Sequence, residues 1–140
     1  MLVPILPIGS PTVNGNIYPK EVIEAALKNV KEPIFGGIER MEGILDISHQ
    51  VKNLRIEGNT LVADVQVLAT EKGQMLQEML EKLGKDVSFT TCGVGQIVEE
   101  NGEKTIADFE LQSINAVVGA EPKPQLFSRE IGMSSRKLSL

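Results

Sequence analysis

The chain has 140 residues, which fits one domain able to bury roughly two-thirds of the surface of the unfolded chain. Its 41% hydrophobic and 24% charged residues are typical of a soluble globular protein. The 14 basic and 19 acidic residues give a net charge of −5, which argues against a nucleic-acid surface because such surfaces need a basic stripe.

A single cysteine and a single histidine exclude further kinds of site. Cys92 has no partner for an intrachain disulfide, which leaves a reducing cytosol as the default compartment. One Cys and one His cannot supply a four-residue zinc site, and we expect neither a metal nor a cofactor. Residues 1–8 are apolar but short and are broken by Pro4 and Pro7, so they predict neither a signal peptide nor a membrane span.

Turn signals and the spacing of apolar residues predict five strands and two helices. The strands are expected over residues 2–8, 47–56, 61–68, 87–98 and 104–115, with hairpin turns at 57–59 and 100–102. Pro19 opens the first helix, Thr70 caps the second, and Gly84 terminates it. The stripe Met75, Leu76, Met79 and Leu80 of the second helix is most simply core, although Met-rich faces also serve as contact surfaces.

These elements predict an α+β domain, built on an antiparallel β-sheet or small barrel and flanked by the two main helices. Such a sheet cannot leave both edges bare, so we expect partial closure or contact with a partner. The domain is expected over residues 1–120. Residues 121–140 lose the periodicity and are expected to form an extended C-terminal arm.

Residues 86–95 read as a strand that runs into a glycine-bearing turn, a place where proteins often mount a nucleophile. The nucleophile candidates are Thr90, Thr91 and Cys92, but a threonine hydroxyl attacks a carbonyl only with a base beside it. Threonines are also ordinary strand formers, and a buried cysteine commonly acts as a small hydrophobe. Gly93 and Gly95 indicate a bulge or a close backbone approach in a sheet, or else a bend whose N–H groups form an oxyanion hole.

His49 is the only possible imidazole base, and it lies at the start of a predicted strand. Such a histidine is either a catalytic base or a hydrogen-bonded part of the structure. Asp46 could orient it, as the third member of a triad does, if both side chains lie on one face. The remaining acidic residues show no paired spacing of the kind that metal or glycosidase sites need, and we expect solvated faces and turn ends at Asp64, Asp86, Asp108 and Glu110.

Five segments between about residues 10 and 122 together resemble the phage prohead core protease family, head-maturation serine proteases whose fold is similar to that of herpesvirus assemblin. They are Asn14-Gly15-Asn16-Ile17-Tyr18-Pro19, Ile47-Ser48-His49, the passage from Ala63 to Thr70 with Gly73, Asp108-Phe109-Glu110-Leu111, and Ala120-Glu121-Pro122. None of them is diagnostic alone. Their order and spacing carry the resemblance.

The sequence differs from the family's pattern at the residues of its catalytic motifs. The family's catalytic histidine lies in Gly-Glu-Leu-x-His-Pro, and Arg40 stands at the corresponding place here. Its nucleophile lies in Ser-Ser-Arg-Gly-x-Gly, which aligns with residues 90–95, where both serines are threonines and the arginine is Cys92. An arginine cannot accept a proton as a base, and losing base and nucleophile together should remove nearly all triad catalysis. The resemblance therefore implies a vestigial site at Arg40, Cys92, Gly93 and Gly95.

The sequence favours a catalytically inactive, capsid-associated structural protein of a bacteriophage, such as a decoration protein, in the virion or the host cytoplasm. Its implied partners are phage capsid or scaffold proteins, contacted in an oligomer or assembly through the C-terminal arm, with no nucleic acid and no membrane. The alternative is an active prohead maturation protease that cleaves scaffold and capsid precursors. It would use His49 with Thr90, Thr91 or Cys92.

Overall fold

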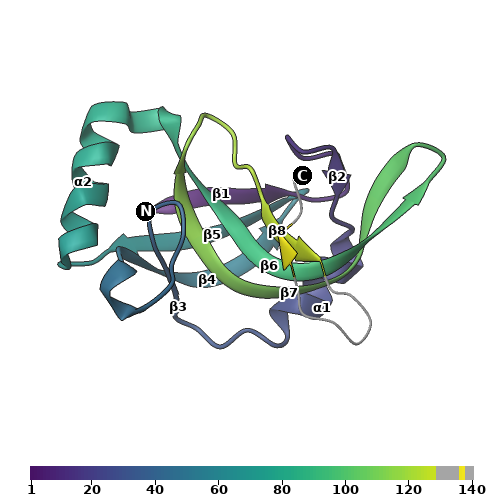
Figure 1. The fold of residues 1–140 in the computed structure, drawn as a ribbon, viewed down its shortest axis with the longest axis horizontal. Helices are drawn as coiled ribbons and strands as arrows, with labels where there is room; N and C mark the ends of the chain where they lie inside the picture. The colour runs from purple at the N-terminus through teal and green to yellow at the C-terminus, as the bar shows by residue number, and fades with distance from the viewer. Residues whose placement is uncertain (129–135, 138–140) are drawn as a thin grey trace.

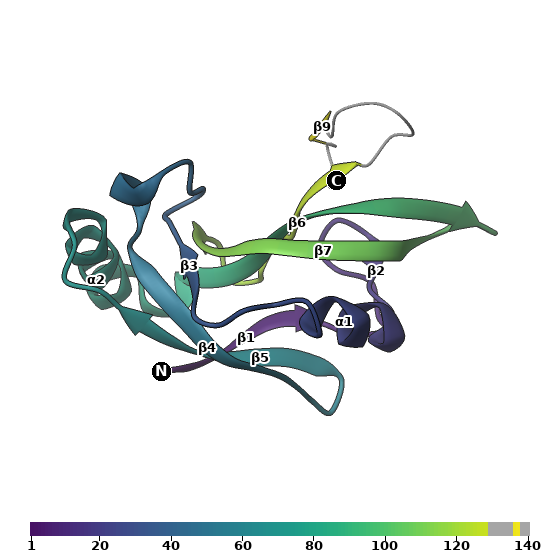
Figure 2. The ribbon, with the colours of Figure 1, turned by 90° about the horizontal axis from the view of Figure 1, so that it is seen from below.

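The computed structural model describes residues 1–128 and 136–137, which form two stacked sheets and two helices (Figures 1 and 2). The first sheet is antiparallel, with the order β1 (Leu2–Pro7), β5 (Thr60–Val67), β4 (His49–Glu57) and β3 (Ile34–Gly36). The second has the order β2 (Asn16–Ile17), β7 (Glu103–Val118), β6 (Val87–Glu100), β8 (Gln125–Ser128) and β9 (Arg136–Lys137). The helices are α1 (Lys20–Leu27) and α2 (Glu71–Leu83), with short 3-10 helices η1 (Ile44–Asp46) and η2 (Gly84–Asp86).

This architecture confirms the predicted α+β class. The five long strands and both helices lie where the sequence predicts them, and β1 is an edge strand, as Pro4 and Pro7 require. The second sheet is mixed rather than antiparallel, because β2 pairs parallel with β7 and β8 pairs parallel with β6. The short strands β2, β3 and β8 were not predicted, since two to four residues carry too little periodicity to signal a strand.

The core lies between the two sheets. Tyr18 and Phe109 meet there at 5.5 Å between ring centroids in an edge-to-face arrangement, which joins two segments of the family resemblance. Aliphatic side chains fill most of the remaining core, as the scarcity of aromatic residues requires; examples from both sheets are Ile5, Leu61, Val65, Ile106, Ile114 and Leu126. No helix in the described part of the chain is long and apolar enough to cross a membrane.

The two sheets are joined along one side by the segment that follows β3. The Ala116 amide donates to the Gly37 carbonyl at 2.9 Å, and the Glu39 amide donates to the Ala116 carbonyl at 2.7 Å. The chain thereby passes from the first sheet onto the outer edge of β7 in the second. These bonds give the sheet pair a partly closed, barrel-like form.

Part of the segment expected as an arm is in the sheet. Residues 125–128 form β8, which pairs with residues 92–95 of β6, and Leu126 is buried in the core. Residues 136–137 pair with β8 as β9. Residues 129–135 and 138–140 lie outside the described part of the chain, so the role of the arm stays a prediction.

Helix α2 begins with the predicted cap. The Gly73 amide donates to Thr70 Oγ1 at 2.9 Å, and the same hydroxyl donates to the Ile47 carbonyl at 2.6 Å, which ties the helix start to the residue before Ser48. Gly73 must be glycine, because a β carbon there would collide with the Leu68 carbonyl oxygen. At the other end Gly84 has a φ of 52°, which favours glycine.

The cap gives a first test. Thr70→Ala should lower the free energy of unfolding by about 1 kcal/mol or more, because it removes the cap and leaves the Ile47 carbonyl without its donor. Thr70→Ser keeps the hydroxyl and should cost clearly less. Urea unfolding followed by circular dichroism would measure both variants, and equal losses for the two would contradict the role of the hydroxyl.

Candidate functional site

The glycine stretch lies inside a continuous strand. Residues 92–95 of β6 pair with β7 on one side and with β8 on the other, so the turn expected after Cys92 is wrong, and β6 runs on to Glu100. The bulge reading is confirmed, because the register with β7 shifts between Cys92 and Gly93. A β carbon on Gly93 or Gly95 would collide with a backbone carbonyl of β7. These glycines are therefore explained by close packing of strands.

His49 is fully buried and links the two sheets by a hydrogen bond. It lies in β4, and its Nε2 is 2.8 Å from the carbonyl oxygen of Ile114 in β7. Its Nδ1 is 2.7 Å from Ser48 Oγ, and its ring packs edge-on against Phe89 at 5.2 Å. Because a carbonyl only accepts, Nε2 carries the proton, and Nδ1 of the neutral ring accepts from the Ser48 hydroxyl. Both ring nitrogens are thus engaged by partners other than the three nucleophile candidates.

Burial governs the protonation of His49. Desolvation lowers its pKa below the ordinary value of 6.5, and the hydrogen bond to Ile114 opposes this shift. Asp46 does not form a triad hydrogen bond with His49, because its carboxylate instead accepts from the Glu42 amide at 2.9 Å and the Gly43 amide at 3.3 Å. The bond from Glu42 lowers the pKa of Asp46. The structure therefore does not bring Asp46 and His49 together as a dyad.

Thr90 and Thr91 are both fully buried on opposite faces of β6. Thr90 is opposite Asn115 in β7, and Thr91 is opposite Ile114, whose carbonyl binds His49. Neither Oγ1 has a hydrogen-bond partner in the described structure. No peptide could reach either hydroxyl without a rearrangement of the strand, because both side chains are closed off from solvent.

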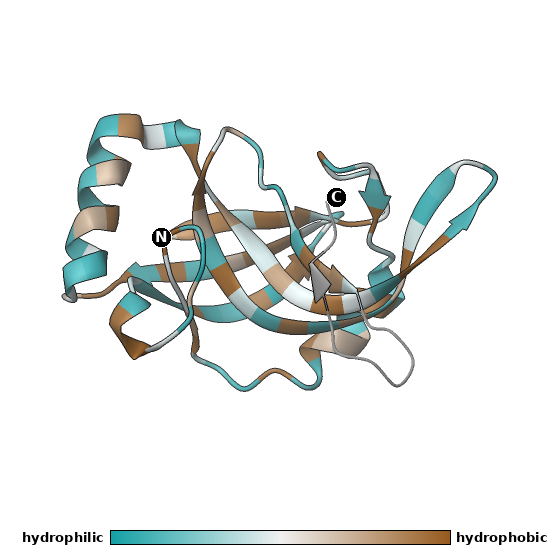
Figure 3. Cartoon of the chain, in the orientation of Figure 1, coloured by the Kyte–Doolittle hydropathy of each residue, from teal (hydrophilic) through white to brown (hydrophobic). Residues whose placement is uncertain are grey.

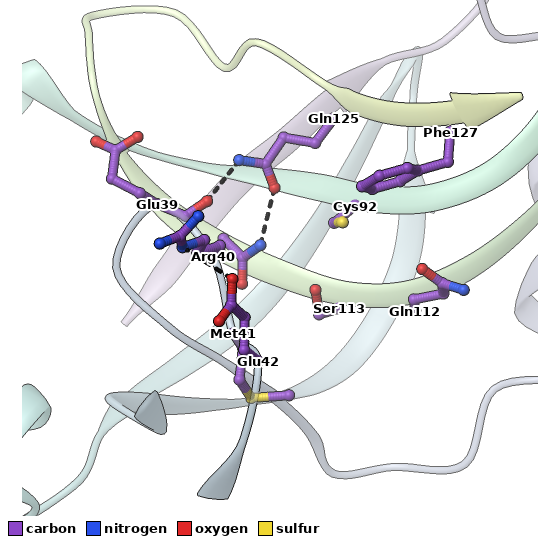
Figure 4. A pocket seen from close by; sticks show the side chains of 10 residues that line it. Glu39, Arg40, Met41, Glu42, Cys92, Gln112, Ser113, Gln125 and Phe127 are labelled. Atoms are coloured by element: carbon purple, nitrogen blue, oxygen red, sulfur yellow. Dashed lines mark hydrogen bonds and ion pairs between the residues drawn. The ribbon is translucent and has the colours of Figure 1, made fainter. Parts of the chain in front are cut away.

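Cys92 and Arg40 both line a pocket on the outer face of the second sheet. The pocket has a volume of about 790 Å³, and its wall includes the half-buried Cys92 side chain. Arg40 forms an exposed ion pair with Glu42 at 3.2 Å on the opposite wall (Figure 4). The remaining lining residues are Glu39, Met41, Gln112, Ser113, Asn115, Gln125 and Phe127. Arg40 and Cys92, the two positions at which the sequence resemblance implies replaced motif residues, thus line the same pocket.

A chain of amides forms one side of this pocket, and sequence reasoning missed it. Asn115 Oδ1 accepts from the Gly37 amide at 3.1 Å, and its Nδ2 donates to Gln125 Oε1 at 2.8 Å. Gln125 Nε2 in turn donates to the Glu39 carbonyl at 2.6 Å. The only signal in the sequence was a polar Asn115 within the apolar run 114–118. This network fixes the segment before Arg40 against β7 and β8.

The pocket offers polar recognition but no imidazole. Its ionisable side chains in the described residues are Glu39, Arg40, Glu42 and Cys92. No group of three or more His, Cys, Asp or Glu that could hold a metal ion occurs in the described ranges. The Asn115 and Gln125 amides already bond to each other and to the backbone of Gly37 and Glu39, so the exposed Gln112 amide and the partly exposed Phe127 ring are the groups best placed to contact a ligand.

The buried histidine generates a pH prediction. Its pKa is lower in the folded than in the unfolded chain, so as the pH falls through about 6.5 the unfolded chain binds the proton first. The free energy of unfolding should therefore fall from pH 7 to pH 5, by at most about 1.4 kcal/mol per pH unit. His49→Gln keeps a donor for Ile114 and should flatten this dependence. Urea unfolding at stepped pH values tests this, and an unchanged slope in the variant would contradict it.

The buried threonines generate a second prediction. Valine has nearly the shape of threonine without the hydroxyl, so Thr90→Val and Thr91→Val should each leave stability unchanged or raise it by about 1 kcal/mol, because an unsatisfied buried hydroxyl is removed. Thermal unfolding provides the measurement. A loss of stability in either variant would mean that the hydroxyl has a partner.

No family model matches the chain, and no curated protein matches it. Among solved structures, the bacteriophage T4 capsid assembly protease gp21 aligns with a TM-score of 0.75 and 18% sequence identity, over 85% of this chain and 81% of that chain. At this identity the likeness establishes the fold and nothing further. The chain therefore has the fold of a phage capsid assembly protease, as the sequence resemblance predicts.

Proposed function

We propose that this chain is a catalytically inactive, capsid-associated protein of a bacteriophage, which uses the capsid protease fold to hold other proteins. The observation that carries the proposal is the position of its only imidazole. His49 is buried between the sheets, and both of its ring nitrogens are occupied, by Ser48 and by Ile114. A general base must reach the proton that it abstracts, and this ring faces the core.

The pocket supports the same proposal. At the place of the family's histidine, the Arg40 guanidinium stays protonated and pairs with Glu42, so it cannot activate the Cys92 thiol by accepting its proton. The hydroxyls of Thr90 and Thr91 are buried beneath the surface. The pocket otherwise holds three amide side chains, the Ser113 hydroxyl, the Cys92 thiol, the Phe127 ring, Met41 and the carboxylates of Glu39 and Glu42, a set that can bind a segment of chain without cutting it.

The proposed partners are capsid or scaffold proteins of the same phage, and the place of action is the virion or the host cytoplasm. The likeness to gp21 supports this choice, because that protein acts in capsid assembly. Residues 121–140 would add contacts to neighbouring subunits as an arm beyond β8. A bound capsid segment would lie across the pocket, between the segment 39–42 and Phe127.

One observation favours a second function. Cys92 is a partly exposed thiol in a pocket large enough for a peptide, and cysteine is the side chain here that attacks a carbonyl most readily. An active prohead protease would therefore use Cys92 and not Thr90 or Thr91. It would need a base that the described pocket residues do not supply as an imidazole.

Cleavage assays separate the two functions. The purified protein, incubated with the scaffold and capsid precursors of its phage, should bind them and leave them intact. Cleavage at defined sites that Cys92→Ala abolishes, and that the matched variant Thr91→Val retains, would overturn the proposal and establish the protease. Mass spectrometry of mature virions should find the chain intact, whereas its absence from virions would contradict a structural role.

A further inference from the structure

Strand β8 is attached to the body of the second sheet along one edge only. Its 4 residues pair parallel with residues 92–95 of β6, and on its other side it pairs only with β9 among the described residues. Leu126 is its buried anchor in the core. Gln125 accepts a hydrogen bond from Asn115 and donates one to the Glu39 carbonyl. The edge of β6 is thus a groove that fits one short strand of this sequence.

The connection that leads into β8 turns the chain back on itself. β7 runs antiparallel to β6 and β8 runs parallel to it, so the direction of the chain reverses within residues 119–124 (Figure 1). No hydrogen bond in the described structure involves residues 120–123. Figure 3 shows the connection as largely hydrophilic, and it contributes no residue to the hydrophobic core. The connection is therefore held mainly at its two ends.

Two prolines in this connection favour a straight form. The bend lies at residues 119–121, and its last residue, Glu121, precedes Pro122. Proline fixes its own φ and biases the residue before it toward the extended region, so the segment from Glu121 to Pro124 favours an extended conformation. A straight connection carries β8 away from its own domain and toward the same groove of another molecule. A short connection that resists bending favours the exchange of a segment between two copies.

We propose that β8 exchanges between two copies of this chain, so that each β8 pairs with β6 of the other copy. The structure identifies the occupant of the groove, because residues 125–128 already lie in it. In the exchanged pair Leu126 enters the core of the other copy, and Gln125 forms its two hydrogen bonds there. Every contact of β8 is made again, and only the connection changes, from bent to straight.

The exchange makes the pocket a shared site. Gln125 and Phe127 of β8 line the pocket that contains Cys92 (Figure 4). In the exchanged pair each pocket is completed by β8 of the other molecule, so whatever binds there contacts two copies at once. This pairing requires no catalytic activity and no capsid protein, and it goes beyond the function proposed above.

A disulfide between β6 and β8 would record which molecule supplies β8. Cys92 and Gln125 are paired across the two strands, and both side chains line the pocket. Because adjacent strands lie about 4.8 Å apart, Gln125→Cys brings a second thiol within disulfide distance of the native one. In a closed chain the disulfide is intramolecular, whereas in the exchanged pair it links two molecules. The chain has no other cysteine to compete.

Gln125→Cys is incubated in the reduced form at several concentrations, then oxidised and run on a non-reducing gel. The covalent dimer should grow as a fraction of the protein between about 0.01 and 1 mM, since a short connection gives β8 a millimolar effective concentration at its own β6. Gln125→Cys with Cys92→Ser is the matched control, because only chance collisions can link its molecules, and it should give little dimer. Sedimentation equilibrium of the wild type should show the same dependence on concentration.

The connection is tested by adding Pro122→Ala and Pro124→Ala to the Gln125→Cys chain. The freer connection bends back more readily, so the dimer fraction at one concentration should fall by about threefold. Three results would overturn the proposal: a disulfide-bonded monomer at every concentration, as much dimer in the control as in Gln125→Cys, or a dimer fraction that the proline changes leave unaltered. The purified chain is tested alone, so none of these results decides the cleavage assay.

Discussion

The hydrogen bond from His49 Nε2 to the Ile114 carbonyl joins the two sheets at the centre of the molecule. It is possible only because Gly36 has no side chain, since a β carbon there would lie 2.6 Å from His49 Nε2 and would collide with the Ile114 carbonyl itself. The chain then crosses from β3 to β7 through backbone bonds at Gly37 and Glu39. The segment that bears Arg40 follows directly, so the geometry of the pocket depends on this junction.

Several residues of the segments that resemble the phage prohead proteases hold parts of the core together, whereas Arg40 and Cys92 line the pocket. Among them, Tyr18, Ser48 and His49 are buried and Phe109 is partly buried, and their contacts hold elements together. The positions at which the sequence resemblance implies changed catalytic side chains are Arg40 and Cys92, which line the pocket, and the buried Thr90 and Thr91. Replacing a pocket side chain removes few packing contacts, because solvent fills the space. Replacing a close-packed side chain leaves a cavity or a clash and lowers the stability of the core. A pocket side chain can therefore change at less cost to the fold than a core side chain.

The local sequence was a good guide wherever a structural feature depends on neighbours in the chain. Thr70 and Gly84 marked the ends of α2 because capping uses groups within one turn, and the Asn-Gly signal at 101–102 marked a hairpin because tight turns need particular residues. The same local reading placed a turn after Cys92, where the structure has a bulge. The two glycines correctly predicted a close backbone approach. The local sequence could not show that β7 pairs with them on one side and β8 on the other.

The sequence by itself determined the class of the fold, its helices and long strands, and the absence of a second imidazole or thiol. Only the tertiary structure decided that His49 faces Ile114 and not a hydroxyl, that Thr90 and Thr91 are covered, and that Cys92 shares a pocket with Arg40. The physical reason is distance along the chain. Secondary structure follows from periodicity and caps within a few residues, whereas a site depends on contacts such as that between positions 49 and 114, which exist only once the sheets have packed.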